Sequence, residues 1–221
     1  MLNLKEFRSR EYALPDLLNP AILAGEVQVL NQSCAVLLNK DGSFSAGVHF
    51  AGPDRESLSH AGIDRLPGVL NQALARLDAG WSVHLSAIRV PADWYIPEDR
   101  IHFPDPVSAL IDTERRMQFE QEGAHFLSRY ALIFTWQTPP ESQVSAGQMF
   151  LESKKDHEPD SFDVLLRKFE DALQSVLGIL RVSFSLRPLD ARGLLTHYHE
   201  CLTGLAHPVN PPDIPAYLDV L

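Results

Sequence analysis

Six short runs of apolar residues, several of them alternating with small or polar residues, predict β-strands. The runs are residues 27–30, 34–39, 44–50, 81–90, 130–136 and 181–186. Asp41-Gly42 separates the second run from the third, and Asp-Gly between apolar runs predicts a hairpin because both residues tolerate a positive φ. We expect the third run to be a half-buried return strand and the fifth run to lie in the middle of the sheet.

Apolar residues at helical spacing predict four helices. They cover residues 57–77, a segment that starts near Pro106, residues 162–180 and a segment with Asp190 as its N-cap. Pro67 should kink or split the first helix, and Gly80 should stop it. The expected core stripes are Ile63, Leu66, Leu70, Leu74 and Leu77 in the first helix, Leu165, Phe169, Ala172, Leu173, Val176 and Leu177 in the third, and Leu194, Leu195, Tyr198, Leu202 and Leu205 in the last.

The order of these elements is hairpin, helix, strand, helix, strand, helix, strand, helix. This order predicts an α+β fold, with a mostly antiparallel or mixed sheet and helices packed mainly on one face. We divide the chain into an N-terminal arm (residues 1–24), an α+β interaction domain (25–206) and a proline-rich connection (207–221). Residues 91–106 form a long connection without a clear element, and residues 148–151 are a candidate edge strand.

Composition narrows the class of partner. The chain has 221 residues, 45% of them hydrophobic and 22% charged, with a formal net charge of −10. These values are typical of a globular protein with a real core, and the negative field would repel nucleic acid phosphates. Cys34 and Cys201 are too few for a disulfide framework, which indicates a reducing compartment. We identify neither a secretory signal nor a transmembrane helix, so contact with a membrane would be peripheral or through a partner.

The glycine spacing of a phosphate-binding loop occurs once, at residues 47–52. In such a loop a lysine and a hydroxyl residue follow the second glycine. Here Pro53 and Asp54 follow it; proline has no N–H to donate, and aspartate would repel a phosphate. We therefore assign these glycines to the end of a strand and a turn.

A metal site is a second candidate, because imidazole and thiolate are zinc ligands. His197 and Cys201 would share a helix face, His199 would point away from it, and His207 or another residue would have to complete the set. The apolar residues of the same helix also account for it as an ordinary core element.

Two further groups of residues have a structural interpretation that we favour over a chemical one. The carboxylates could serve acid–base chemistry, but two arginines lie among them, which favours a solvated helix with i,i+3 and i,i+4 ion pairs. They are Asp112, Glu114, Glu120 and Glu122, beside Arg115 and Arg116. The aromatic set could stack on bases, but it has no basic groove beside it and is expected in the core. Its members are Phe126, Tyr130, Phe134 and Trp136.

Several spaced motifs occur together in one order. They are MLNLKEFRSR at the N-terminus, LNKDGSF followed by FxGPD, NQALARLDAGW, ERRMQFEQEGAHFLSRYALIFTW, and RPLDARGLLTHYHECL followed by HPV. In this combination the chain resembles the N-terminal region of the CagE/TrbE/VirB family, and specifically a TrbE-type conjugative transfer ATPase. The resemblance extends nearly from end to end.

The resemblance implies a large parent ATPase of a type IV secretion or conjugation machine, cytoplasmic and peripheral at the inner membrane. It implies a hexamer whose ATP and Mg²⁺ bind in a motor domain C-terminal to residue 221, so no catalytic, cofactor-binding or metal-binding residue of the family is carried onto this sequence. The N-terminal domain would contact inner-membrane subunits of the machine and neighbouring protomers, and would not bind nucleic acid directly.

Three hypotheses follow. The first is a non-catalytic interaction domain that anchors the transfer ATPase to its channel. The alternatives are a stand-alone metal-dependent enzyme that uses His197 and Cys201, and a DNA-handling module of the transfer apparatus. Under the first hypothesis the charged helix is a docking surface, and replacing both Arg115 and Arg116 by glutamate should leave folding intact while weakening assembly.

Overall fold

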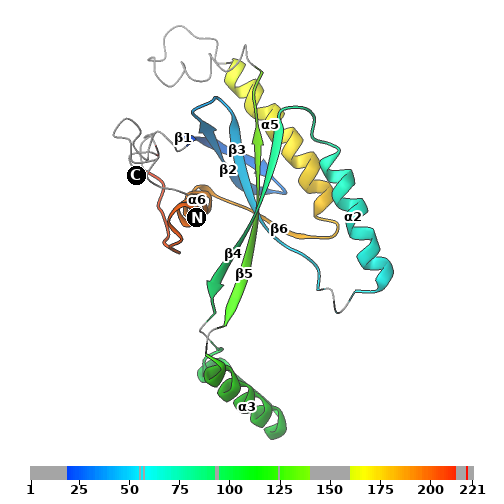
Figure 1. Cartoon of the computed structure of the whole chain (residues 1–221), viewed down its shortest axis with the longest axis vertical. Helices are drawn as coiled ribbons and strands as arrows, with labels where there is room; N and C mark the ends of the chain where they lie inside the picture. The colour runs from blue at the N-terminus through cyan, green and yellow to red at the C-terminus, as the bar shows by residue number, and fades with distance from the viewer. Residues whose placement is uncertain are drawn as a thin grey trace, which may run out of the picture. The chain divides into compact units, whose positions relative to one another are not determined.

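A computed structural model of the chain describes residues 19–54, 56, 58–92, 95–123, 125–139, 160–212 and 218 (Figure 1). The elements, in chain order, are β1 (Pro20–Val29), β2 (Gln32–Asn39), β3 (Phe44–Ala51), α2 (His60–Leu74), β4 (Trp81–Pro91), the 3₁₀ helix η2 (Glu98–Arg100), α3 (Pro106–Glu122), β5 (Phe126–Trp136), α5 (Asp160–Leu180), β6 (Ser185–Pro188) and α6 (Ala191–Thr203). The candidate edge strand at residues 148–151 lies outside the described residues, as does most of the predicted N-terminal arm. Residues 20–24 of that arm belong to β1.

The strands form a six-stranded sheet in the order β1-β2-β3-β5-β4, with β6 paired to β3. All the paired registers are antiparallel, which confirms the predicted α+β class with an antiparallel sheet. β5 pairs along one edge of β3 from Phe44 to Phe50. β2 pairs with the first residues of β3 and β6 with the last residues, so these two strands share its other edge. The middle of the sheet is therefore β3, and the prediction that residues 130–136 occupy it was wrong.

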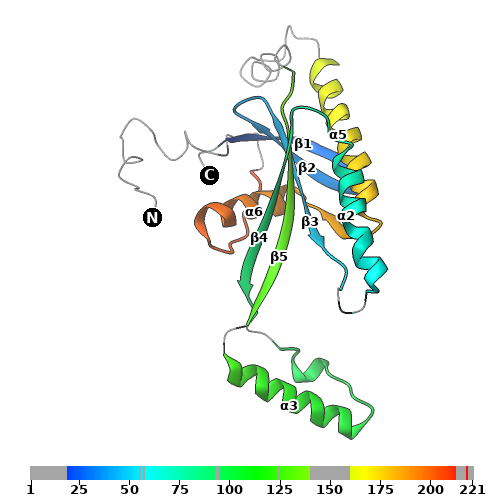
Figure 2. The same cartoon turned by 45° about the vertical axis from the view of Figure 1, so that its right-hand side comes forward.

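Both faces of the sheet are covered, because helices pack on each of them (Figures 1 and 2). The larger core lies between the sheet and the face that carries α2 and α5. It takes Val36 and Leu38 from β2 and Phe44 from β3. Leu37 of β2 points to the opposite face, where it packs with residues of α6 and of the segment before it. Residues 44–48 are accordingly buried on both faces, so β3 is not the half-buried strand that we predicted.

Phe169 of α5 is the centre of the larger core. Its ring stacks on Trp81 with centroids 5.3 Å apart, and lies 6.4 Å from Trp136 and 5.8 Å from Phe44. Its side chain is fully buried, as most of the predicted α5 stripe is. Burial of an aromatic side chain contributes several kcal/mol to folding, roughly 3–5 by the cost of its truncation, so α5 is firmly held on the sheet.

Two turns join the first three strands. Leu30 and Asn31 link β1 to β2 with φ values of 54° and 62°, the signature of a type I′ turn. Asn39 N–H donates to the Ser43 carbonyl across the second turn, at 2.8 Å. Asp41 orders this turn by accepting hydrogen bonds from the Ser43 N–H at 3.0 Å and hydroxyl at 2.6 Å. The hairpin predicted at Asp41-Gly42 is confirmed, with a four-residue connection.

α5 also protects the outer edge of β1. The backbone N–H groups of Gln28 and Leu30 each donate a 2.9 Å hydrogen bond, to Glu170 and Gln174 of α5 respectively. Unpaired donors on an edge strand invite pairing with another chain, and these two donors are satisfied within the chain.

Three predicted boundaries or stripes are corrected by the structure. α2 continues through Pro67 and ends at Ala75, so Gly80 does not stop it; Gly80 has a φ of 93° just before β4. The buried side of α2 carries Val69 and Ala73, whereas Leu70 and Leu74 are exposed.

β6 starts at residue 185 and not at residue 181. The backbone after α5 forms a turn, in which the N–H groups of Arg181 and Phe184 donate to carbonyls of the last helical residues. In α6, the predicted core residues Leu202 and Leu205 are exposed.

Aspartate caps fix the starts of α3 and α6. The Asp105 carboxylate accepts from the Ser108 N–H at 3.0 Å, and the Asp190 carboxylate accepts from the Gly193 N–H at 2.8 Å. Pro106 occupies the first turn of α3, where its missing N–H costs nothing. These sequence-predicted starts are confirmed.

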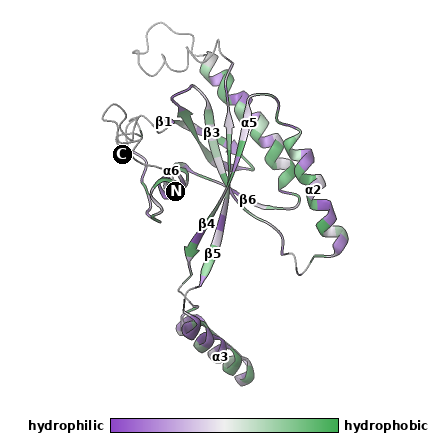
Figure 3. Cartoon of the chain, in the orientation of Figure 1, coloured by the Kyte–Doolittle hydropathy of each residue, from purple (hydrophilic) through white to green (hydrophobic). Residues whose placement is uncertain are grey.

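The chain divides into two compact units. Unit 1 comprises residues 1–86 and 130–221, and unit 2 comprises Ala87–Arg129. Unit 2 contains η2, α3, the last residues of β4 and the first residues of β5. Figure 3 shows that hydrophobic and hydrophilic residues are both present along α3, and none of its residues is buried.

Candidate functional site

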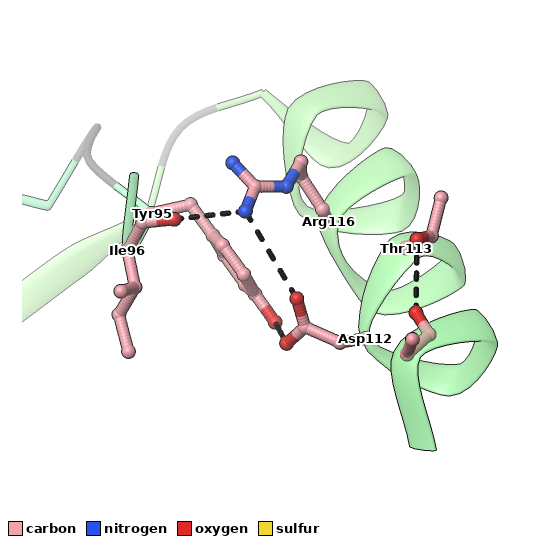
Figure 4. Close-up of polar contacts among 6 residues, drawn as sticks. Tyr95, Ile96, Asp112, Thr113 and Arg116 are labelled. Carbon is pink, nitrogen blue, oxygen red and sulfur yellow. Dashed lines mark hydrogen bonds and ion pairs between the residues drawn. The ribbon is translucent and has the colours of Figure 1, made fainter. Parts of the chain in front are cut away.

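Arg116 of α3 organises the interior of unit 2 (Figure 4). Its guanidinium donates to the Ile96 carbonyl at 2.8 Å, lies 3.9 Å from the Asp112 carboxylate, and covers the Tyr95 ring at 4.8 Å from the ring centroid. The Tyr95 hydroxyl donates to the other Asp112 oxygen at 2.8 Å. We call these four residues the Arg116 clasp. The clasp ties the long connection before α3 to one side of that helix.

The clasp continues into an aromatic stack. Tyr95 lies 5.6 Å from Phe119, and Phe119 stacks on His125 with centroids 3.8 Å apart. The Ala92 N–H donates to the His125 carbonyl at 2.8 Å. The hydrogen bond to Asp112, with burial and the Asp112 charge, raises the pKa of Tyr95, so this tyrosine stays a neutral donor at neutral pH. One side of α3 is thus engaged within unit 2.

The other side of α3 presents large apolar side chains to solvent. Val107 is 62% exposed, Leu110 61%, Ile111 46% and Met117 49%. Their spacing of i, i+3, i+4 and i+10 places them on one stripe of the helix, and Glu114 falls within this stripe at i+7. We call these five residues the α3 outer face.

Unit 2 as a whole is unusually apolar on its surface. Of the sixteen large hydrophobic side chains that are exposed among the described residues, eight lie in this unit of about a fifth of the chain. They are Ile96, Phe103, Val107, Leu110, Ile111, Met117, Phe126 and Leu127. A concentration of exposed apolar side chains is typical of an interaction site.

The acid–base candidates on α3 do not form a catalytic pair in the residues that the structure describes. Asp112 is engaged by Tyr95 and Arg116, whereas Glu114, Glu120 and Glu122 are exposed. The predicted i,i+4 ion pairing is present between Asp112 and Arg116. Arg116 is, however, a structural residue with only 16% of its side chain exposed. The expectation that its replacement would leave the local fold intact is therefore wrong, whereas Arg115 is exposed as expected.

His197 and Cys201 lie together on α6, as the helical spacing predicts. His197 Nε2 is 3.1 Å from Ser86 Oγ of β4 and 3.6 Å from Cys201 Sγ. His199 points away and its ring lies 5.8 Å from that of His207. The four candidate metal ligands are thus divided into two pairs, and no group of three or more His, Cys, Asp or Glu side chains that could hold a metal ion occurs among the described residues.

The chemistry of the His197 neighbourhood is that of a packed core. Burial, with the nearby Glu200 charge, raises the pKa of the Cys201 thiol. Burial also raises the pKa of Tyr198, against the effect of its hydrogen bond with Ser45. A raised thiol pKa lowers the fraction of nucleophilic thiolate. This region holds α6 against the sheet.

Gly47 has a packing role that differs from the strand-end role we predicted. It lies in the middle of β3, where its carbonyl accepts from the Leu189 N–H at 2.9 Å. A Cβ at this position would lie 2.7 Å from Ile133 Cδ1 and 2.9 Å from Leu189 Cδ1. Gly52 has open space around its Cα. The pair therefore does not form a loop that cradles a ligand.

The aromatic set of β5 is divided between core and surface. Phe134 is fully buried and Trp136 packs in the larger core, as predicted. Phe126 is 49% exposed and Tyr130 41% exposed, so these two are not core residues. The Arg89 guanidinium lies 5.2 Å from the centre of the Phe126 ring.

The α3 outer face was missed by the sequence reasoning, which used only the charged half of the helix, residues 112–122. The signal was present: Val107, Leu110 and Ile111 follow the N-cap directly at i, i+3 and i+4. Such a stripe predicts an apolar face, but the same signal predicts core burial, and only the structure distinguishes the two.

Similar proteins identify the larger system. A family model described as the type IV secretion system ATPase VirB4/TrbE, N-terminal domain, matches residues 35–144. The conjugal transfer protein TrbE of Rhizobium radiobacter is 37% identical over an alignment that covers 100% of this chain and 28% of that protein. A probable conjugal transfer protein TrbE of Sinorhizobium fredii (strain NBRC 101917 / NGR234) is 41% identical over 67% of this chain and 93% of that protein.

The chain spans 28% of the length of the Rhizobium radiobacter relative. Among the described residues, no helix combines the length and the hydropathy that a membrane crossing requires. The family match, the two relatives and the antiparallel α+β fold agree with one another. The chain therefore belongs to the VirB4/TrbE N-terminal domain family of type IV secretion system ATPases, and it is of the TrbE type.

Proposed function

We propose that this chain is a non-catalytic interaction domain that docks a conjugal transfer ATPase on inner-membrane subunits of its machine and on neighbouring protomers. The parent protein would energise DNA or protein transfer and pilus assembly. Its ATP and Mg²⁺ would bind in a motor domain C-terminal to residue 221, and the chain would act at the cytoplasmic side of the inner membrane.

The observation that carries the docking proposal is the exposed apolar surface of unit 2. Eight large hydrophobic side chains are exposed there, and one side of α3 is fixed by the Arg116 clasp while the other carries the α3 outer face. Apolar side chains presented on a rigid helix are suited to binding, because little conformational entropy is lost when a partner covers them.

The non-catalytic assignment is supported by the role of the glycines. The only glycine spacing of the phosphate-loop type that we identify in the sequence has one member packed tightly inside the sheet and another in open space. The candidate ligands around His197 are engaged with Ser86 and with one another.

The test has two measurements. ATP turnover of the purified chain should equal that of a mock preparation, and turnover above this background would overturn the non-catalytic assignment. Affinity purification of the chain from cells that express the conjugation machine should capture its inner-membrane subunits. Capture should be lost in Leu110→Asp and kept in Leu202→Asp, an exposed leucine on α6. Equal capture by both variants would contradict docking through α3.

A further inference from the structure

The α3 outer face combines apolar side chains with a carboxylate at its centre. Val107, Leu110 and Ile111 form an apolar ridge over the first turns, and Met117 extends it one and a half turns further on. Glu114 is exposed within this stripe. A partner that covers the ridge must also cover Glu114 or pass close to it.

The charges around the ridge are predominantly negative. Glu114, Glu120 and Glu122 are exposed on α3, and Arg115 is the exposed arginine among them. Arg116, the other arginine of the helix, is held in the clasp. The surface that a partner meets on α3 is therefore apolar at one end and acidic at the other.

This charge pattern disfavours a lipid surface as the occupant. Helices that lie in the membrane interface carry Lys and Arg on their polar face, and the anionic lipids of the cytoplasmic leaflet attract basic segments. The three exposed glutamates of α3 would be repelled by such lipids.

A second copy of α3 is disfavoured for a related reason. The same stripe of a second helix would present apolar, amide and carboxylate side chains to Glu114, and no basic group. Burial of a carboxylate without a counter-charge costs several kcal/mol, so a symmetric pair of α3 helices would be weak.

We infer that the α3 outer face binds an amphipathic helix whose apolar stripe covers Val107, Leu110 and Ile111 and whose Lys or Arg side chains pair with Glu114 and the acidic end of α3. Rows of side chains at i, i+3 and i+4 are the surface on which a second helix packs. This inference rests on the proposed function and gives the chemistry of the docked segment.

The test uses two helical peptides of about eighteen residues, some five turns, with the same leucine positions. One has lysine at every polar position and the other has glutamate. Binding to the purified chain is measured by fluorescence anisotropy at about 150 mM salt, where the Debye length of about 8 Å suppresses long-range attraction. The lysine peptide should bind at least about tenfold more tightly than the glutamate peptide.

Two variants separate docking from simple attraction to an acidic protein. Leu110→Asp adds negative charge, so it would strengthen non-specific binding of the lysine peptide, whereas loss of an apolar anchor should weaken docking by more than about tenfold. Glu114→Lys should weaken the lysine peptide by about tenfold and improve the glutamate peptide. Leu202→Asp should match the unsubstituted chain.

The inference is overturned if neither peptide binds, if both bind equally, or if Leu110→Asp retains full binding. Sedimentation with phosphatidylglycerol vesicles that Leu110→Asp abolishes would assign the face to a membrane. Dimerisation that Leu110→Asp abolishes would assign it to a second copy. If inner-membrane subunits are still captured through Leu110 while the peptides fail, only the partner chemistry is refuted, and the docking proposal stands.

Discussion

Gly47→Ala is a direct test of how the sheet and α6 are packed. The added Cβ would lie 2.7 Å from Ile133 Cδ1, 2.9 Å from Leu189 Cδ1 and 3.1 Å from Leu194 Cδ1. Carbon atoms attract best at about 3.5–4.0 Å, so all three contacts are repulsive. The three side chains are buried and come from β5, from the segment before α6 and from α6 itself, which leaves each little room to withdraw.

Overpacking of a buried site by one methyl group costs about 1–3 kcal/mol. For a chain of this size each kcal/mol lowers the melting temperature by roughly 2–4 °C. Gly47→Ala should therefore melt about 2–12 °C lower in a thermal unfolding experiment followed by circular dichroism. Gly52→Ala is the matched control, because nothing lies within 4 Å of the position that its methyl group would take, and it should change stability by less than about 0.5 kcal/mol.

A double mutant identifies the cause. Ile133→Val removes the Cδ1 atom that makes the closest contact, at a cost of about 0.5–1.5 kcal/mol when made alone. If the clash is the mechanism, Gly47→Ala combined with Ile133→Val should be more stable than the sum of the single effects predicts. Strict additivity, or a Gly47→Ala variant as stable as the unsubstituted chain, would refute the packing argument.

Three further results are expected. Arg116→Glu should make unit 2 more sensitive to limited proteolysis because it breaks the clasp, whereas Arg115→Glu should not; equal sensitivity would contradict the clasp. Burial raises the pKa of Cys34 to about 11, so a thiol reagent at a pH of about 8 should label Cys201 in the native chain and reach Cys34 only after unfolding; comparable labelling of both would refute this. Burial would raise the pKa of Asp41, but its hydrogen bonds outweigh burial and lower the pKa from the ordinary value of 3.8. The Asp41 carboxylate therefore stabilises the fold above that ordinary value, and the contribution is lost as pH falls through the folded pKa. Asp41→Asn should accordingly lower the melting temperature at neutral pH but have a shrinking effect below pH 3.8, and a constant difference would count against it.

Much of the fold could be predicted because local signals agreed with the tertiary structure. The stripe of α5 is regular along the helix, and the caps at Asp105 and Asp190 are residues that accept hydrogen bonds from free N–H groups of the first turn. The Asp41-Gly42 turn has a strong sequence preference for its conformation. In each case short-range chemistry determines the element.

Other features depend on distant residues. The positive φ of Leu30 is not signalled by its residue type, since leucine disfavours this region; hydrogen bonding to Gln174 of α5 and packing in the core hold it there. The central place of β3 follows from its pairing with three strands, and one of them, β6, is distant in the sequence. Periodicity within a single run does not contain this information.

The candidate site was predictable only to a limited extent. The charge of α3 and the separation of His199 from His197 followed from helical spacing. The clasp did not, because Tyr95 lies in a proline-rich connection that has no periodic pattern. The exposure of Leu110 and its neighbours did not either, because an apolar stripe ordinarily predicts burial. That conflict between pattern and exposure is what points to a partner.

Site-specific photo-crosslinking from position 110 tests the docking proposal most directly. A photo-reactive amino acid would replace Leu110 in the chain, and be activated in cells that carry the conjugation machine. The account predicts adducts with an inner-membrane subunit of the machine, at a basic amphipathic segment, and no such adducts from position 202. An absence of subunit adducts at position 110, or equal adducts from both positions, would contradict it.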